Sequence, residues 1–129
     1  MRYALALLFV AHGIAHLSGF LTSWRLASLE GLAYKTTVLA GRVDVGEVGI
    51  RIIGVFWLLA ALGFVVAGIG TTLALPWWGT LTAVVASFSL VLSVLEWPEA
   101  KIGVAVNLVI LVYSGIAAQA ESSAPRQGG

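Results

Sequence analysis

The chain has 129 residues, of which 60% are hydrophobic and only 10% are charged, and its formal net charge is +1. Soluble domains average about 45–50% apolar and about 25% charged residues, so these few ionic groups could not cover a surface that faces water. The composition argues against a soluble enzyme, a nucleic-acid-binding protein and a disordered chain, and the absence of cysteine removes disulfides and thiolate metal sites. It indicates a small integral membrane protein.

Three stretches of the chain carry no Asp, Glu, Lys or Arg: residues 3–24, 52–95 and 102–120. A helix needs about 20 apolar residues to cross a hydrocarbon core of about 30 Å. The first and last stretches are each long enough for one span, and the middle stretch is long enough for two, with a break between Gly68 and Pro76. The sequence therefore predicts transmembrane helices at about 3–23, 50–70, 77–96 and 101–119.

The second and third connections between these helices are short. Trp77 and Trp78 mark the membrane interface at the second, and Pro98 stops one helix and lets the next begin at the third. Short links make sequential helices antiparallel neighbours, so the predicted fold is an all-α, up-down four-helix transmembrane bundle. We expect one domain over residues 1–120 and a disordered tail over 121–129, which is rich in Ser, Pro, Gln and Gly.

The first connection, at about residues 24–49, is long and polar, and we expect it to be interfacial or irregular. In residues 24–34 the leucines recur at roughly helical spacing, which is typical of a segment that lies along the membrane surface. Residues 40–46 are typical of a turn. The connection carries charged residues of both signs: Arg25, Glu30, Lys35, Arg42, Asp44 and Glu47.

Basic residues predict the orientation in the membrane. Five of them lie on the side of the first and third connections, against Arg2 and Arg126 on the other side. The positive-inside rule then places both termini outside the cytoplasm. The N-terminal segment has features of a signal peptide, but no small-x-small cleavage site follows it and two histidines interrupt its apolar core. We therefore expect an uncleaved first span.

Polar residues inside the spans are the candidates for a binding site. His12 and His16 are four residues apart, so their imidazoles lie on one face of a helix. Ionisable groups at this depth are costly, and they usually face the bundle interior or a wet cavity. At a rise of about 1.5 Å per residue, counting from the helix ends places His16 level with Asn107 and Trp57, and His12 nearer Tyr113. Glu96, at the end of the third helix, reaches this cluster only if its side chain points inward.

Three interpretations of the histidine pair compete. The favoured one is structural, with neutral imidazoles that hydrogen-bond to Asn107, serines or backbone carbonyls and hold helices together. The second is a site that binds a small molecule or handles protons, because histidine titrates near neutral pH. The third is a metal or haem site, for which Glu96 is the one further ligand within reach. We predict no metal and no cofactor, and His12 and His16 are the only metal candidates.

Several stretches together carry a resemblance. They are the segment from His12 to Phe20 (His-Gly-Ile-Ala-His-Leu-Ser-Gly-Phe) and residues 41–46, 57–61, 77–78 and 97–107. The chain resembles, over nearly its whole length except the tail, an uncharacterised group of small bacterial four-span membrane proteins. A similar region looks like the N-terminal part of some longer uncharacterised bacterial proteins, and the architecture is loosely similar to DoxX-like proteins. The resemblance implies a bacterial inner-membrane protein and one recurring pattern of His12, His16 and Asn107, and it implies no activity.

Three functions fit these observations. The first is an accessory or structural membrane module, since no complete catalytic constellation is present and we make no enzyme assignment. The second is a binder or enzyme for a lipophilic small molecule such as a quinone, isoprenoid or lipid, with His16 and His12 in a pocket inside the bundle and Asn107 orienting them. The third is an oligomeric transporter or proton pathway. The expected partners are the lipid bilayer, a lipophilic small molecule, and a homo-oligomer or larger membrane assembly, with no nucleic acid.

Overall fold

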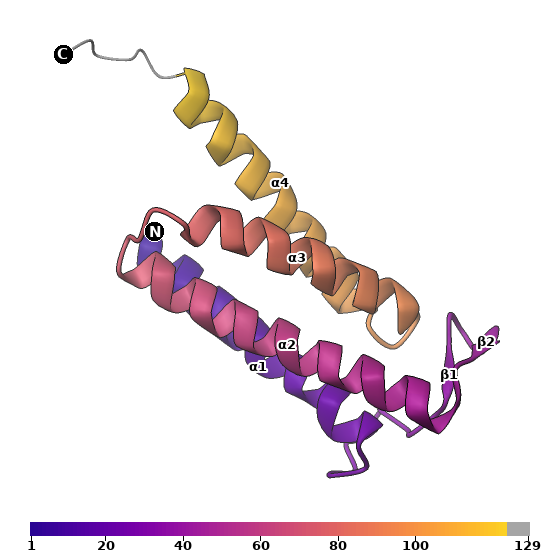
Figure 1. Ribbon diagram of the computed structural model, residues 1–129. Helices are drawn as coiled ribbons and strands as arrows, with labels where there is room; N and C mark the ends of the chain where they lie inside the picture. The colour runs from indigo at the N-terminus through magenta and orange to yellow at the C-terminus, as the bar shows by residue number, and fades with distance from the viewer. Residues whose placement is uncertain (124–129) are drawn as a thin grey trace.

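The computed structural model describes residues 1–123, and it consists of four helices and one small hairpin (Figure 1). The helices are α1 (Arg2–Ser23), α2 (Gly46–Thr72), α3 (Trp78–Leu95) and α4 (Lys101–Ser123). All four are long and apolar enough to cross a membrane. The strands β1 (Thr37–Val38) and β2 (Val43–Asp44) pair antiparallel in the first connection. The predicted all-α, four-span architecture is confirmed.

Extensive packing joins helices that are neighbours in sequence, α1 with α2, α2 with α3 and α3 with α4, as an up-down bundle requires. The α1–α2 pair is the most extensive of the three. Glycine allows this close approach, because a Cβ at Gly13 would lie 2.8 Å from the carbonyl oxygen of Ala61. One turn and a half further along α1, a Cβ at Gly19 would lie 2.5 Å from the indole ring of Trp57.

Two helices are longer than the apolar pattern predicted. α2 begins at Gly46 rather than at residue 50, because its charged first turn continues the helix beyond the apolar span. Glu47 in that turn suits the positive end of the helix dipole, and its carboxylate accepts a 2.7 Å hydrogen bond from Arg25. α4 continues to Ser123, since neither proline nor glycine interrupts residues 116–123. The rest of the predicted disordered tail, residues 124–129, lies outside the described residues.

The first connection is irregular, which is one of the two forms expected for it, and the leucine spacing at residues 24–34 does not produce a helix. Arg25 and Gly31 adopt φ values of 55° and 78°, which a right-handed helix does not allow. The turn predicted at residues 40–46 is confirmed as the hairpin between β1 and β2. This hairpin is bound to the α3–α4 connection, since the amides of Leu39 and Ala40 donate hydrogen bonds of 2.7 and 3.0 Å to the carbonyl oxygens of Leu95 and Trp97.

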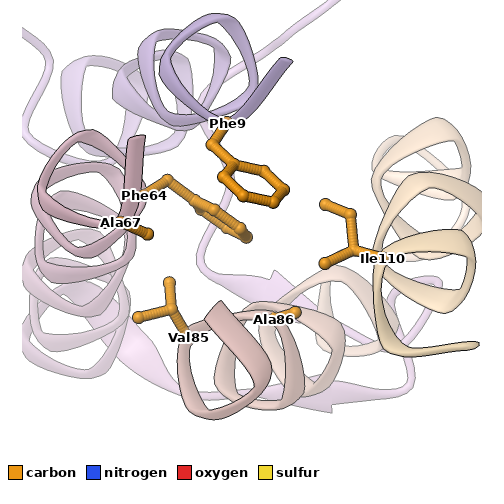
Figure 2. Packing of buried hydrophobic residues seen from close by; sticks show 6 residues of the cluster. All are labelled: Phe9, Phe64, Ala67, Val85, Ala86 and Ile110. Atoms are coloured by element: carbon orange, nitrogen blue, oxygen red, sulfur yellow. The ribbon is translucent and has the colours of Figure 1, made fainter. Parts of the chain in front are cut away.

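Two buried apolar clusters fill the bundle. The first, which we name the distal core, receives side chains from all four helices, and Figure 2 shows them pointing toward one another: Phe9, Phe64, Ala67, Val85, Ala86 and Ile110. The second, the loop-end core, lies nearer the first and third connections: Val38, Ile50, Ile53, Trp57, Ala60 and Leu92. The two histidines of α1 lie against both clusters, since their rings contact Phe64 of the distal core and Trp57 of the loop-end core.

A candidate polar site and cavity inside the bundle

A hydrogen-bond network of buried side chains crosses the bundle. His12 Nε2 on α1 donates to Asn107 Oδ1 on α4, at 3.1 Å. Asn107 Nδ2 in turn donates to Ser89 Oγ on α3 at 2.8 Å, and lies 3.4 Å from Ser93 Oγ. His16 Nε2 is hydrogen-bonded to Ser89 Oγ, and His16 Nδ1 lies 2.7 Å from the carbonyl oxygen of His12. We name these five residues the polar network.

The partners assign a direction to every bond in the polar network. The carbonyl oxygen of His12 only accepts, so His16 carries its proton on Nδ1 and its Nε2 accepts from the hydroxyl of Ser89. The amide oxygen of Asn107 also only accepts, so the proton of a neutral His12 is on Nε2. The bonds therefore run from His12 through Asn107, Ser89 and His16 back to the backbone of His12. The two imidazoles are opposite tautomers, and the lone pair on Nδ1 of His12 has no hydrogen-bond partner among the residues that the structure describes.

The network joins α1 to α3 and α4, two helices against which α1 does not pack extensively. His12 and His16 lie one turn apart on α1, and Ser89 and Ser93 lie one turn apart on α3, so each pair faces inward from one side of its helix. Asn107, which is fully buried on α4, connects them. In lipid an unpaired amide costs several kcal/mol, so a closed set of bonds fixes these three helices relative to one another.

Aromatic rings of α2 cover the network from the remaining side. The ring of Phe64 lies edge-on to His12 and His16, with centroids 4.8 and 5.3 Å away. The indole of Trp57 lies edge-on to His16 at 5.1 Å. The two imidazoles are themselves 4.4 Å apart in an edge-to-face arrangement. These rings exclude lipid and water from one side of the histidine pair, so access to it comes from elsewhere.

That access is a cavity of about 270 Å³, which reaches from the histidine pair to the loop end of the bundle. Its wall includes residues of α1, α2 and α4, the segment 32–35 of the first connection, and the α3–α4 connection. The wall is mostly apolar, and His12 and His16 stand at its inner end. A cleft with apolar walls and a few polar groups is the usual form of a small-molecule site.

Three charged side chains stand together at the outer end of this cavity. Lys35 Nζ lies 2.9 Å from a carboxylate oxygen of Glu99 and 3.7 Å from one of Glu96. Burial raises the pKa of the Glu96 carboxyl, although the charge of Lys35 opposes this. The hydrogen bond from Lys35 lowers the pKa of Glu99. We name Lys35, Glu96 and Glu99 the mouth triad. Within it, the ammonium of Lys35 lies closer to the carboxylate of Glu99 than to that of Glu96.

Some polar atoms of the cavity wall have no hydrogen-bond partner in the part of the chain that the structure describes. Thr22 Oγ1 is buried without a partner. His12 bonds through Nε2 only, and Trp57 makes no hydrogen bond through its indole N–H within residues 1–123. A buried polar group normally finds a partner, so these atoms are available to a molecule in the cavity.

The structure brings together most of the residues that the sequence singled out. His12, His16 and Asn107 form hydrogen bonds in one network, Trp57 packs on His16, and Glu96 lines the cavity. The depth match was wrong in one respect, because Asn107 pairs with His12 rather than with His16. Counting from helix ends assumes parallel helices, whereas α4 diverges from α3 toward its C-terminal end (Figure 1).

Tyr113 lies apart from this cluster. Its side chain is on α4 and is 38% exposed, and it does not line the cavity. Sequence reasoning did not single out Lys35 and Thr22, and it expected serine partners for the histidines without assigning that role to Ser89 and Ser93. The spacing of Ser89 and Ser93 was the one available signal, since two hydroxyls four residues apart in an apolar helix share a face.

The donor set does not point to a metal. Within residues 1–123, no group of three or more His, Cys, Asp or Glu side chains is placed to hold one ion. Comparisons of the chain with protein-family models, with curated proteins and with solved structures found no match. The expected resemblance therefore stands only at the level of a four-span architecture, and the site has to be interpreted from its own chemistry.

Proposed function

We propose that this protein binds a small lipophilic molecule inside its helix bundle, with the polar network as the inner end of the site. The observation that carries the proposal is the cavity of about 270 Å³ that connects the two histidines to the loop end. An engineered apolar cavity of about 150 Å³ accommodates benzene, so this volume suits one ring with a short chain, or a segment of a longer lipid.

The wall supports this proposal in two ways. It is mostly apolar, which favours a ligand that partitions into the bilayer. It also presents Thr22 Oγ1 and the Nδ1 lone pair of His12 without partners among the described residues. A bound molecule with a polar group would satisfy atoms that the fold leaves unpaired.

A structural membrane module is the second candidate function. The hydrogen bonds of the polar network favour it, because they link the helices in one continuous circuit that returns to α1. The bonds of His12 to Asn107, of Asn107 to Ser89 and of Ser89 to His16 each connect two helices, as a purely structural role requires. Such a role leaves the cavity and its unpartnered atoms unexplained. The two functions predict different results when the cavity is filled by a side chain.

The test is native mass spectrometry of the protein after gentle extraction, together with organic extraction of the same sample. Wild type is compared with Ala15→Phe, which adds a ring at an exposed position on the cavity wall, and with Ala11→Phe one turn earlier on α1, where the alanine is also exposed but does not line the cavity. We expect a bound lipophile in wild type and Ala11→Phe, and its loss in Ala15→Phe.

A structural module would give a different pattern. All three proteins would then have the mass of the bare chain, or the same lipids in the same amounts. Either result from folded protein overturns the binding proposal. Circular dichroism and size-exclusion profiles of the two variants establish that they are folded alike.

We further propose that the cavity opens toward the cytoplasm, because the basic residues gather at the loop end. The chain has no cysteine, so single cysteines report accessibility without background. A membrane-impermeant maleimide should label Ser28→Cys only after the cells are opened, and Thr72→Cys in intact cells. The reverse pattern would place the cavity mouth on the outer side.

A further inference from the structure

The polar atoms of the cavity wall that have no partner among residues 1–123 differ in what they can bond and in where they lie. His12 Nδ1 accepts, because the proton of the ring is on the nitrogen bonded to Asn107. The indole N–H of Trp57 only donates. The rings of His12 and Trp57 both pack on His16 at the inner end, whereas Thr22 lies ten residues after His12 on α1, about 15 Å nearer the loop end. A ligand group that both donates and accepts matches His12 and Trp57, whereas a carbonyl or an ether leaves the lone pair of His12 unpaired.

The charges on the wall argue against an anionic ligand. Among the described residues that line the cavity, Lys35 is the only Lys or Arg, and its ammonium is already shared by Glu99 and Glu96. A carboxylate or phosphate entering the cavity would pass these two acids and reach an inner end that holds neutral groups. Burying a charge without a partner is far more costly than burying a hydroxyl.

We propose that the cavity takes an uncharged amphiphile whose hydroxyl group, phenolic or alcoholic, donates to Nδ1 of His12 and accepts from the indole N–H of Trp57. This inference rests on the proposed binding function and names the chemical class of its ligand. The apolar part of the molecule then lies along the wall toward the loop end, below the mouth triad.

Three matched probes test it: 4-pentylphenol, 4-pentylanisole and 4-pentylbenzoate. They share ring and chain, and they differ in a hydroxyl, a methyl ether that cannot donate, and an anion. Saturable binding is measured on the full chain in lipid nanodiscs, with empty nanodiscs as the correction for partition into lipid. We expect the phenol to bind about tenfold more tightly than the anisole, as one neutral hydrogen bond allows, and the benzoate to bind least.

A pair of variants locates the binding. Trp57→Phe removes the indole N–H but keeps a ring against His16, and it should weaken both the phenol and the anisole several-fold, because either oxygen can accept from the indole. Thr22→Val is the control, because Thr22 lines the same cavity but lies nearer its loop end, beyond the reach of a hydroxyl bonded to His12. It should leave both affinities unchanged.

The outcomes separate this inference from the proposed function. Equal saturable binding of phenol and anisole, blocked by Ala15→Phe, would overturn the hydroxyl requirement and leave the binding function in place. Preference for the benzoate would also overturn it. If no probe binds but a lipophile copurifies with wild type, the hydroxyl class is wrong and the cavity function stands. If no probe binds and nothing copurifies, both proposals fail.

Discussion

The two halves of this bundle are built from the same four helices but use different chemistry. The distal core is filled by aromatic and aliphatic side chains from all four helices, as Figure 2 shows. The loop-end half contains the polar network, a cavity and a charged mouth. Lipid is as apolar as leucine, so burial of apolar surface contributes little to helix association in a membrane. The distal half is therefore held by close packing, whereas the loop-end half adds hydrogen bonds and a cavity to an apolar core of its own.

Phe64 belongs to both halves, and its truncation should have the largest effect on stability. Its side chain is fully buried in the distal core, and its ring also contacts both imidazoles. Phe64→Ala should cost about 3 kcal/mol, through a cavity that the neighbours cannot fill. Reversible unfolding in mixed micelles measures this change. Phe88→Ala, at an exposed ring that meets only Phe56 among the aromatic rings described, should cost much less; equal losses would contradict the role of Phe64.

Close packing of α1 on α2 can be tested at Gly13. A Cβ there would lie 2.8 Å from the carbonyl oxygen of Ala61 and 3.0 Å from Cβ of Phe64, both of which are held in place. Gly13→Ala should cost about 1–3 kcal/mol, as overpacking does. Gly115→Ala is the control, since a Cβ there meets nothing within 4 Å. The control should be neutral or slightly stabilising because alanine favours the helix. A neutral Gly13→Ala would show that the helices lie further apart.

Asn107 tests whether the polar network holds the loop-end half together. Asn107→Leu leaves His12 Nε2 and the serine hydroxyls without their amide partner. We expect a loss of about 1–2 kcal/mol, because interhelical hydrogen bonds in membranes average about 0.6 kcal/mol each. Ser114→Ala on the same helix removes only a bond to its own backbone and should have little effect. An Asn107→Leu protein as stable as wild type would mean that the network does not hold the bundle.

The mouth triad should give the smallest effect, and its sign depends on pH. Burial raises the pKa of Glu96, so the folded protein holds that proton more tightly than the unfolded chain. The resulting stability is complete below the ordinary glutamate pKa and is lost as pH rises through the raised value. The glutamine of Glu96→Gln stays neutral at every pH. The melting temperature of this variant relative to wild type should therefore rise as pH increases from the ordinary glutamate pKa through the raised pKa of Glu96.

Glu99→Gln is the matched variant with the opposite sign. The hydrogen bond from Lys35 lowers the pKa of Glu99, so its contribution is present above the ordinary glutamate pKa and is lost as pH falls through the lowered value. This variant should be less stable than wild type near neutral pH and should match it in acid. If the melting temperatures of the two variants, relative to wild type, changed with pH in the same way, Lys35 would not distinguish the two carboxylates.

The parts of the site that the sequence predicts are those that stand out in an apolar span. His12, His16 and Asn107 are costly in lipid unless paired, so their positions alone indicated an interior cluster. Serine gives no such signal, because its hydroxyl can bond to its own helix, as Ser87 does. The same four spans followed from the charge-free stretches, whose lengths the bilayer dictates.

The loop-end features could not be predicted in this way. Lys35 reaches the α3–α4 connection because the β1–β2 hairpin binds there through backbone amides of Leu39 and Ala40. Backbone hydrogen bonds between distant segments cannot be predicted from residue type, because every residue except proline has the same backbone donor and acceptor. The cavity likewise depends on how four helices and one irregular segment fit together, and no local pattern encodes such a space.

The most direct test of this account is ¹⁵N NMR of the histidine side chains in nanodiscs, with and without 4-pentylphenol. The account predicts two neutral rings of opposite tautomer, His12 protonated on Nε2 and His16 on Nδ1. It also predicts that the phenol shifts Nδ1 of His12 toward the value of a hydrogen-bond acceptor and leaves His16 nearly unchanged. Two rings with the same tautomer, or a phenol that leaves His12 unaffected at saturation, would contradict it.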